Sequence, residues 1–211
     1  MFTKTLSTNA TASLALLGNS GILNKGYLAG GTACALQLGH RISLDLDFFT
    51  DKEFSTDLVL NQLSKLHGFK LDETEEWIIL GGFPKVKFSY FYYPYPLIKK
   101  VTIFSKVNVS SLEDISAMKI AAVCERGTKR DFIDLYFLIK KKFSLDDILN
   151  FYDKKYKKLA SNFLHIVKSL NYFDDAESQS MPDMLIPVSW DEVKKFFQDQ
   201  VILLAKRKLG I

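Results

Sequence analysis

The sequence of 211 residues contains only two cysteines, Cys34 and Cys124, and five prolines. The cysteines form no C-x-x-C pair, and both stand in apolar segments that we expect to be helical. A disulfide or a cysteine-based metal site is therefore not indicated. No apolar run approaches the roughly 20 residues that a membrane span needs, and the start of the sequence lacks the features of a signal peptide. We expect a cytoplasmic protein with no membrane partner.

A large excess of charge of one sign is also missing. The sequence has 28 Lys and Arg residues against 24 Asp and Glu residues, for a formal net charge of +4. Hydrophobic residues make up 47% of it, which is enough for a core and argues against disorder. The positive excess falls in basic clusters at residues 140–142, 154–158 and 206–208. Two interpretations stay open for them: solvated helix faces, or a shallow surface for nucleic-acid phosphates.

Internal repeats and low-complexity segments are absent from the sequence, so its organisation follows from local patterns. Hydrophobic periodicity predicts an α+β region over residues 1–110 and a helical region over residues 111–211. Ser189 with Glu192 forms a capping box that predicts the start of the last helix. The other expected helices are 9–20, 32–38, 56–67, 112–124, 128–141, 145–157 and 160–170. The expected strands are 27–29, 44–49, 69–71, 77–80, 86–92 and one within 101–109, with a hairpin at 81–84.

Gly30, Gly31 and Thr32 stand between a short apolar strand and an Ala/Leu-rich helix. A helix that starts there presents free backbone N–H groups and the positive end of its dipole. Glycine lets a phosphate approach the backbone closely, and Thr32 can add a hydroxyl. The three residues are therefore candidates for binding a nucleotide phosphate. Two glycines at such a turn can also have a steric role alone.

Asp45 and Asp47 alternate with apolar residues in the segment LDLDFF. In a strand, residues i and i+2 point to the same face, about 6–7 Å apart along the chain. Two carboxylates among apolar side chains are costly to half-bury without a cation, and Mg²⁺ prefers oxygen ligands of this kind. Taken alone, the pair can equally be two solvated aspartates. With only 13 residues between Gly31 and Asp45, a phosphate site and a metal site are expected to meet at neighbouring strand ends.

The segment GGTACALQLGHRISLDLDFF resembles the core motif of the DNA polymerase β-like nucleotidyltransferase superfamily. Within that superfamily it is similar to the AbiEii/AbiGii toxin family, whose glycine-glycine-threonine helix is followed by His-Arg-x-Ser-x-Asp-x-Asp. His40, Arg41, Ser43, Asp45 and Asp47 occupy those five positions. The resemblance implies that Asp45 and Asp47 are catalytic metal ligands and that Arg41 and Ser43 belong to the nucleotide-binding site.

A second segment, MKIAAVCERGTKRDFIDLYFL, resembles a later motif of the same family. The resemblance implies that Lys119 contacts nucleotide phosphates as a catalytic residue, that Arg126 binds the nucleotide and that Asp131 completes or supports the active site. Other interpretations of single residues stay open. Lys119 can be a surface lysine, Asp131 can complete a helix cap, and Asp134 can pair locally on its helix. The matching positions are Lys119, Ala122, Arg126, Arg130, Asp131, Asp134 and Leu135.

The resemblance covers nearly the whole chain and sets the functional expectation. It implies a small mixed-sheet nucleotidyltransferase core in residues 1–110 and a helical region, residues 111–211, that completes the active site. The activity would be transfer of a nucleotide from an NTP to an acceptor hydroxyl with Mg²⁺ or Mn²⁺. RNA, tRNA in particular, would be the acceptor. The chain would be the toxin of a toxin–antitoxin or phage-defence pair, with a cognate antitoxin protein as partner.

One departure from the superfamily pattern leaves alternatives open. A third carboxylate is usual on a later strand, but the corresponding segment here, residues 85–89, offers Lys87 and Ser89. Asp131 or water can fill the gap, the protein can use one metal ion, or it can be a nucleotide-binding module without catalysis. Asp-x-Asp also occurs in phosphatases with an aspartyl nucleophile, although that interpretation leaves the glycine motif and the second segment unexplained.

Overall fold

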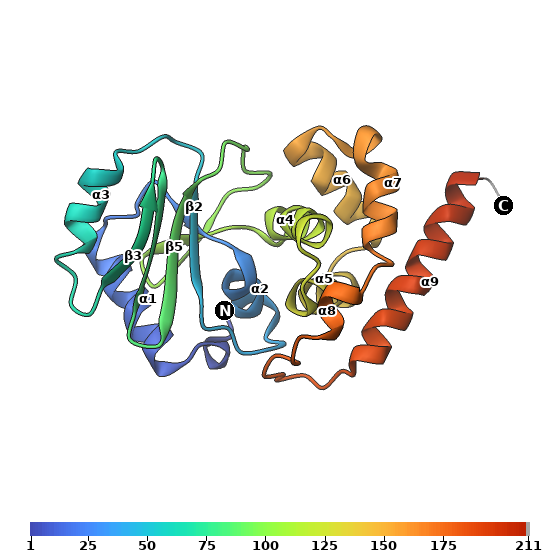
Figure 1. The fold of residues 1–211 in the computed structure, drawn as a ribbon, viewed down its shortest axis with the longest axis horizontal. Coiled ribbons are helices and arrows are strands. Elements are labelled where there is room, and N and C mark those ends of the chain that lie inside the picture. Colours follow the sequence, from blue (N-terminus) through green and yellow to red (C-terminus); the bar gives the residue numbers. More distant parts are fainter. Residues whose placement is uncertain (210–211) are drawn as a thin grey trace. The chain divides into compact units, whose positions relative to one another are not determined.

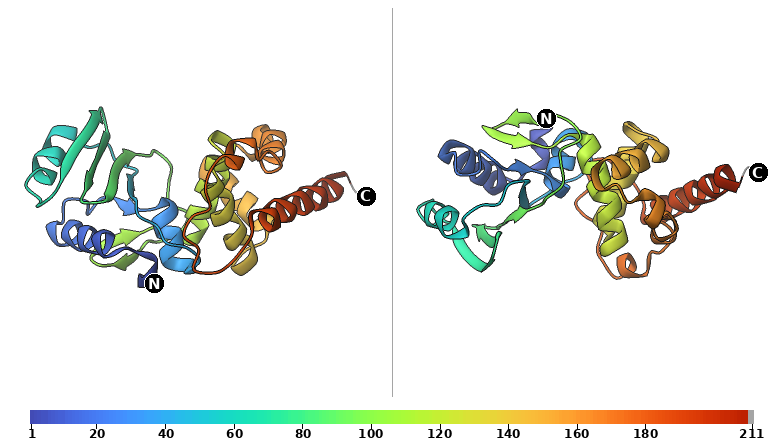
Figure 2. Two further views of the ribbon diagram at one scale, coloured as in Figure 1. Left: turned by 60° about the horizontal axis from the view of Figure 1, so that its bottom comes forward. Right: turned by 90° about the horizontal axis from the view of Figure 1, so that it is seen from above.

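The structure, a computed structural model, describes residues 1–209 of the chain. The chain divides into two compact units, Met1–Ser111 and Leu112–Ile211. Unit 1 contains the strands and three of the α-helices, and the described part of unit 2 contains helices (Figures 1 and 2). The predicted α+β class with a helical C-terminal region is therefore confirmed. None of the helices formed by residues 1–209 has the length and apolar composition needed to cross a membrane.

Unit 1 is built on a mixed seven-stranded sheet with the order β3-β4-β5-β2-β1-β7-β6. β2 runs parallel to β5, and β1 runs parallel to β7, whereas the other neighbours are antiparallel. β2 therefore lies in the middle of the sheet, with β1 on one side and β5 on the other. The strands are β1 (Tyr27–Leu28), β2 (Leu46–Thr50), β3 (Lys70–Glu75), β4 (Ile78–Phe83), β5 (Val86–Tyr92), β6 (Thr102–Phe104) and β7 (Val107–Val109).

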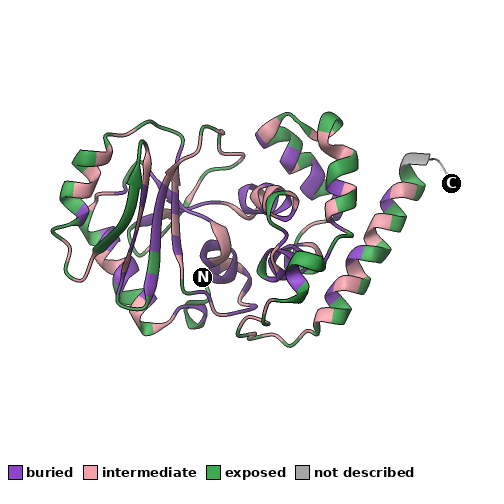
Figure 3. Ribbon diagram, in the orientation of Figure 1, coloured by how far each residue is buried: buried purple, intermediate pink, exposed green. Residues whose placement is uncertain are grey.

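One face of the sheet forms the core of unit 1. Leu46 and Phe48 of β2 are fully buried, as are Phe88 of β5 and Ile79 of β4 to within a few per cent. The alternate residues of these strands are less buried, which is the period-two pattern of a sheet with one covered face. β3, with the sequence KLDETE, is exposed along its whole length (Figure 3). Its charges protect this edge of the sheet from pairing with other chains.

The helices of unit 1 begin and end at recognisable capping residues. Ser7 caps α1 (Thr8–Ser20), and Ser55 caps α3 (Thr56–Leu63), each through a hydroxyl that accepts a backbone N–H. α2 (Gly30–Leu38) ends at Gly39, which adopts a left-handed conformation. α1 packs against β5 and β7, α3 against β4, and α2 against β2.

Unit 2 consists of helices packed around a mainly aromatic and aliphatic core. Phe132, Ile133 and Leu135 of α5 are fully buried, as are Phe197 and Val193 of α9. Ser189 accepts the N–H of Glu192 at the start of α9, as the capping box predicts. The helices are α4 (Leu112–Glu125), α5 (Lys129–Lys141), α6 (Leu145–Tyr156), α7 (Leu159–Ser169), α8 (Asp174–Glu177) and α9 (Trp190–Leu209).

Two hairpins of unit 1 differ in detail from the expectation. Gly81 and Gly82 lie inside β4, and the hairpin turn is formed by Pro84 and Lys85 instead. Glycine is needed in the strand because a Cβ at Gly81 would lie 2.5 Å from the carbonyl oxygen of Lys70 on β3. The single strand expected within residues 101–109 is a hairpin of two short strands.

Candidate active site

Helix α2 begins directly after β1 at a turn built from two glycines. Gly30 has a φ of +62°, and a Cβ there would lie 2.9 Å from Oδ2 of Asp47. At Gly31 a Cβ would collide with Nη2 of Arg41. The N-cap residue is Ala29, whose side chain cannot accept hydrogen bonds from the first turn. The start of α2 therefore keeps backbone N–H groups and a partial positive charge, which is the arrangement that binds phosphate at helix N-termini.

The two aspartates of the motif lie on one face at the start of β2. Leu46, Phe48 and Thr50 are buried, whereas Asp45, just before Leu46, and Asp47 are half-exposed. Asp45 immediately precedes the strand, which begins at Leu46 and not at Leu44 as expected, because pairing with β5 starts there. Both carboxylates thus share the half-exposed face in the middle of the sheet, beside the start of α2.

Ser89 occupies the position on β5 that faces Asp47. The parallel register pairs the two residues, and Oγ of Ser89 donates a hydrogen bond of 2.5 Å to Oδ1 of Asp47. Lys87, two residues earlier on β5, is exposed and lies on the same face of the strand. The strand on which the family resemblance leads us to expect a third carboxylate therefore places a hydroxyl beside Asp47.

Three further motif residues hold the backbone that carries Asp45. The hydroxyl of Thr32, which is buried, contacts Oγ of Ser43 at 2.8 Å and the carbonyl oxygen of Asp45. Because the carbonyl can only accept, Thr32 donates to Asp45 and Ser43 donates to Thr32. Arg41 is buried as well, and its Nη1 donates to the carbonyl of Ile42 at 3.0 Å. What Thr32 offers to a ligand is therefore its backbone N–H, since its hydroxyl is engaged within the chain.

In unit 2, helices α4 and α5 hold a buried lysine between two buried carboxylates. Nζ of Lys119 lies 2.8 Å from Oδ1 of Asp131 and 2.6 Å from Oδ2 of Asp134. The three side chains are 5%, 1% and 0% exposed. Asp131 and Asp134 are three residues apart on α5, so both face the same direction, toward α4. Lys119 is thus not a surface lysine, and Asp134 pairs across two helices.

Asp131 accepts four hydrogen bonds, which is the full capacity of a carboxylate. Besides Lys119, the donors are Nε of Arg126 at 2.8 Å, Nη2 of Arg126 at 3.1 Å and the hydroxyl of Thr128 at 2.5 Å. Burial would raise the pKa of Asp131, but the charges of Lys119 and Arg126 and their hydrogen bonds outweigh it and hold that pKa well below its usual value. The ionised Asp131 fixes Lys119 and Arg126 in place. The side chain of Arg126, 64% exposed, is the part of this cluster that a phosphate can reach.

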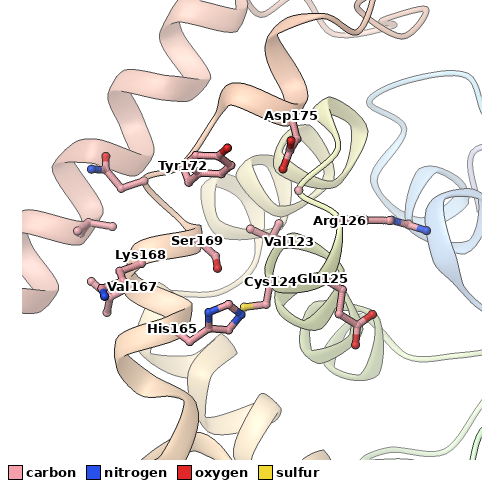
Figure 4. Close-up of a pocket in the computed structure, with 13 residues that line it drawn as sticks. Val123, Cys124, Glu125, Arg126, His165, Val167, Lys168, Ser169, Tyr172 and Asp175 are labelled. Carbon is pink, nitrogen blue, oxygen red and sulfur yellow. The ribbon is translucent and has the colours of Figure 1, made fainter.

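A cavity of about 570 Å³ lies in unit 2 beside Arg126, between the end of α4, α7 and the segment that follows α7 (Figure 4). Cys124 and His165 both line it. Burial raises the pKa of the Cys124 thiol to about 11, although a hydrogen bond with Ser169 acts in the opposite direction. The thiol therefore stays protonated near neutral pH and is a poor nucleophile.

Unit 2 contains a second buried ion pair that the sequence patterns did not predict. Nζ of Lys155 lies 2.9 Å from Oδ1 of Asp114, and both side chains are fully buried. Lys155 belongs to the basic cluster at 154–158, for which a solvated helix face or a phosphate-binding surface is expected. A signal was present in the sequence, because Lys155 follows Ile148 and Tyr152 at helical spacing and so falls on the buried face of α6.

Comparison with known proteins places the chain in a family. The family model described as "Nucleotidyl transferase AbiEii toxin, Type IV TA system" matches residues 84–203, more than half of the chain. An uncharacterized protein of Aquifex aeolicus (strain VF5), aq_aa25, is 39% identical over 189 residues, which cover 86% of this chain and 88% of that protein. The match to the relative therefore extends well beyond the segment that the family model covers.

Two solved structures share the fold. JHP933 from Helicobacter pylori superposes with a TM-score of 0.54 at 23% identity, over 96% of this chain and 94% of that one. MenT4, a nucleotidyltransferase toxin from Mycobacterium tuberculosis H37Rv, superposes with a TM-score of 0.54 at 16% identity, over 93% and 86%. With these comparisons, the family expected from the two sequence motifs is confirmed: the chain belongs to the AbiEii family of nucleotidyltransferase toxins.

Proposed function

We propose that this chain is a metal-dependent enzyme that transfers a nucleotide from an NTP to an acceptor hydroxyl. The observation that carries the proposal is the position of Asp45 and Asp47 on one half-exposed face, next to the uncapped start of α2. A carboxylate pair and a phosphate-binding helix start are the two elements that phosphoryl transfer needs side by side, since its catalysis rests on positioning and charge neutralisation.

The donor atoms at this place suit Mg²⁺ or Mn²⁺. Both ions take carboxylate oxygens, and Asp45 and Asp47 supply them from a surface that NTP can reach. The hydrogen bond from Ser89 orients the carboxylate of Asp47. Because Ser89 replaces a carboxylate, the set fits one ion held by two aspartates better than it fits two ions. When bound, the ion would neutralise charge on the phosphates and on the departing pyrophosphate.

In this proposal the chain's own residues bind the nucleotide and orient it. The backbone N–H groups of Gly30, Gly31 and Thr32 hold the phosphates that leave, and Arg41 and Ser43 keep this turn in shape. The acceptor hydroxyl oxygen attacks the α-phosphorus, and the bond from that phosphorus to the bridging oxygen of the β-phosphate breaks. Pyrophosphate leaves with the bonding electrons, and the hydroxyl proton passes to solvent.

Unit 2 contributes a positively charged group in the same proposal. Arg126 is the accessible cation of the cluster that also contains Lys119 and Asp131, and it is the candidate for a phosphate contact. Lys119 and Asp131 act as positioning residues, because each is saturated by its partners in the buried cluster. Asp131 accepts four hydrogen bonds already, so it would have to lose some of them to act as a metal ligand.

We infer RNA as the acceptor, with tRNA ends among the candidates, and a role as the toxin of a toxin–antitoxin or phage-defence pair with a cognate antitoxin. The support is the family description, which names a toxin of a type IV toxin–antitoxin system. The net charge of +4 is compatible with a polyanionic acceptor.

Label transfer tests the proposal. Purified protein is incubated with Mg²⁺, each α-labelled NTP in turn, and total cellular RNA and protein. We expect label in an RNA band that is lost with Asp45→Asn and with Asp47→Asn. The control is Asp57→Asn, which removes the same charge from an exposed site on α3. Lys119 is unsuitable here, because its substitution is expected to destabilise unit 2 severely, so lost labelling would not report on the site.

The hydroxyl of Ser89 beside Asp47 favours one other function, which is nucleotide binding without catalysis. A site with two carboxylates and no third can retain NTP and a metal ion without turning over. Measured NTP affinity that depends on Asp45 and Mg²⁺, with no label transferred to any cellular fraction, would select this alternative.

A further inference from the structure

A groove of about 680 Å³ on unit 1 begins at Asp45 and runs across the ends of the neighbouring strands. Three lysines line it: Lys70 at the start of β3, Lys85 in the β4–β5 turn and Lys87 on β5. We call it the lysine groove. Its acidic residues are Asp45 itself and Asp72, so the three lysines outnumber the carboxylates, and the positive excess grows when a cation neutralises Asp45.

The strand register sets two of these lysines in line with Asp45. Gly82 of β4 pairs with Lys70 on one side and with Lys87 on the other. Because directly paired residues share a face, Lys70, Gly82 and Lys87 form a row on the face that carries Ser89 and Asp47. The next strand beyond β5 is β2. Because the ladder between β2 and β5 begins one residue after Asp45, Asp45 lies at the end of the same row. The row thus leads from Asp45 to Lys70 over three strand spacings, roughly 14 Å at about 4.8 Å each.

The lysines of the groove are available to a ligand. All three are exposed, and within the described residues 1–209 none of them forms an ion pair. Gly82, which lies between Lys70 and Lys87, leaves the middle of the row without a side chain. A chain with regularly spaced anionic groups can therefore lie across the strands with its phosphates near the ammonium groups.

The geometry of in-line displacement indicates which substrate approaches along this groove. The attacking and leaving oxygens must stand on opposite sides of the α-phosphorus. The start of α2, where the departing phosphates are proposed to bind, follows β1 and so lies on the β1 side of β2. The acceptor must then approach from the β5 side, which is the side of the lysine groove.

We propose that the lysine groove binds the sugar-phosphate backbone of a nucleic-acid acceptor and leads its terminal hydroxyl to Asp45. This inference rests on the proposed nucleotidyl transfer, because the direction of approach follows from that reaction. It adds the acceptor's binding site and the residues that bind it: Lys70, Lys85 and Lys87 contact successive phosphates, and they take no part in binding NTP.

The test compares two triple variants that lose the same charge. Lys70, Lys85 and Lys87 are changed to Gln in one, and Lys4, Lys25 and Lys65, which are also exposed in unit 1, are changed to Gln in the other. Fluorescence anisotropy with a short labelled single-stranded oligoribonucleotide gives the affinity over a series of salt concentrations. Loss of three phosphate contacts is expected to reduce the magnitude of the slope of log K against log salt by about 2 and to weaken binding by roughly two to three orders of magnitude at about 50 mM salt. The control triple variant should bind nearly as the wild type does.

Two further readouts separate the groove from a structural effect and from the reaction. Lys85 has a φ of +62°, so Lys85→Gly relieves the turn while removing one charge. We expect this variant to melt no lower than the wild type and still to bind RNA more weakly. In label transfer, the groove variants should raise KM for RNA and leave KM for NTP unchanged.

Three results would overturn the inference: no RNA binding by the wild type, equal weakening in both triple variants, or label in protein only. Failure of the proposed reaction looks different, because RNA binding that depends on the groove would then persist while no label is transferred by any variant.

Discussion

Removal of the buried ammonium group of Lys119 should destabilise unit 2 severely. In Lys119→Met, the carboxylates of Asp131 and Asp134 stay buried but lose the charge that lies 2.8 and 2.6 Å from them. Breaking a buried ion pair by removing one partner costs about 3–5 kcal/mol. For a unit of about 100 residues this corresponds to a fall in melting temperature of at least ~12 °C. Urea unfolding followed by far-UV circular dichroism measures the loss.

A matched substitution and a compensating one make this test decisive. Lys154→Met removes an exposed lysine from α6, and we expect it to change stability by no more than about 0.5 kcal/mol. Replacing Asp134 with Asn in the Lys119→Met background removes one of the stranded charges and should recover part of the loss. If Lys119→Met costs as little as Lys154→Met, the buried cluster does not hold α4 against α5.

Two further predictions follow from pKa values. The pKa of Asp131 is lower in the folded protein than in the unfolded chain, so its stabilising effect is complete above about pH 4 and is lost as the pH falls below that value. Urea unfolding over a pH series should show that the free energy of unfolding falls less steeply with acid in Asp131→Asn than in the wild type, and an equally steep fall would contradict this. The pKa of Cys124, raised to about 11, predicts alkylation by iodoacetamide in a Cys34→Ala background roughly a hundredfold slower near pH 8 than for a free thiol, whereas reaction at the rate of a free thiol would show that Cys124 is not buried in solution.

Local patterns were sufficient to predict the architecture around the motif. The alternation of Asp45 and Asp47 with buried apolar residues is visible in the sequence, because a strand has a period of two. The glycines before α2 and the serine cap of α9 are equally local signals. For these elements the physical cause lies within a few residues, and the structure has them close to the expected bounds.

Contacts between distant segments were beyond the reach of sequence patterns. The helical spacing of Lys155 indicates a buried position but does not identify its partner, because Lys119 and Lys155 pair with carboxylates 12 and 41 residues away in the chain. Gly81 and Gly82 resemble turn residues, yet they lie inside β4 because a neighbouring backbone approaches too closely for a side chain. The contact of Ser89 with Asp47 depends on the pairing of β2 with β5, whose register local periodicity does not fix.

Label transfer from α-labelled NTP with Mg²⁺ and total cellular RNA tests the central claim most directly, with the wild type, Asp45→Asn, Asp47→Asn and the control Asp57→Asn compared at equal fractions folded. The proposed reaction predicts labelled RNA from the wild type and from Asp57→Asn, and none from either variant of the carboxylate pair. Undiminished labelling by Asp45→Asn and Asp47→Asn would contradict the assignment of this site, and no labelling by the wild type, with NTP still bound, would contradict the proposed transfer itself.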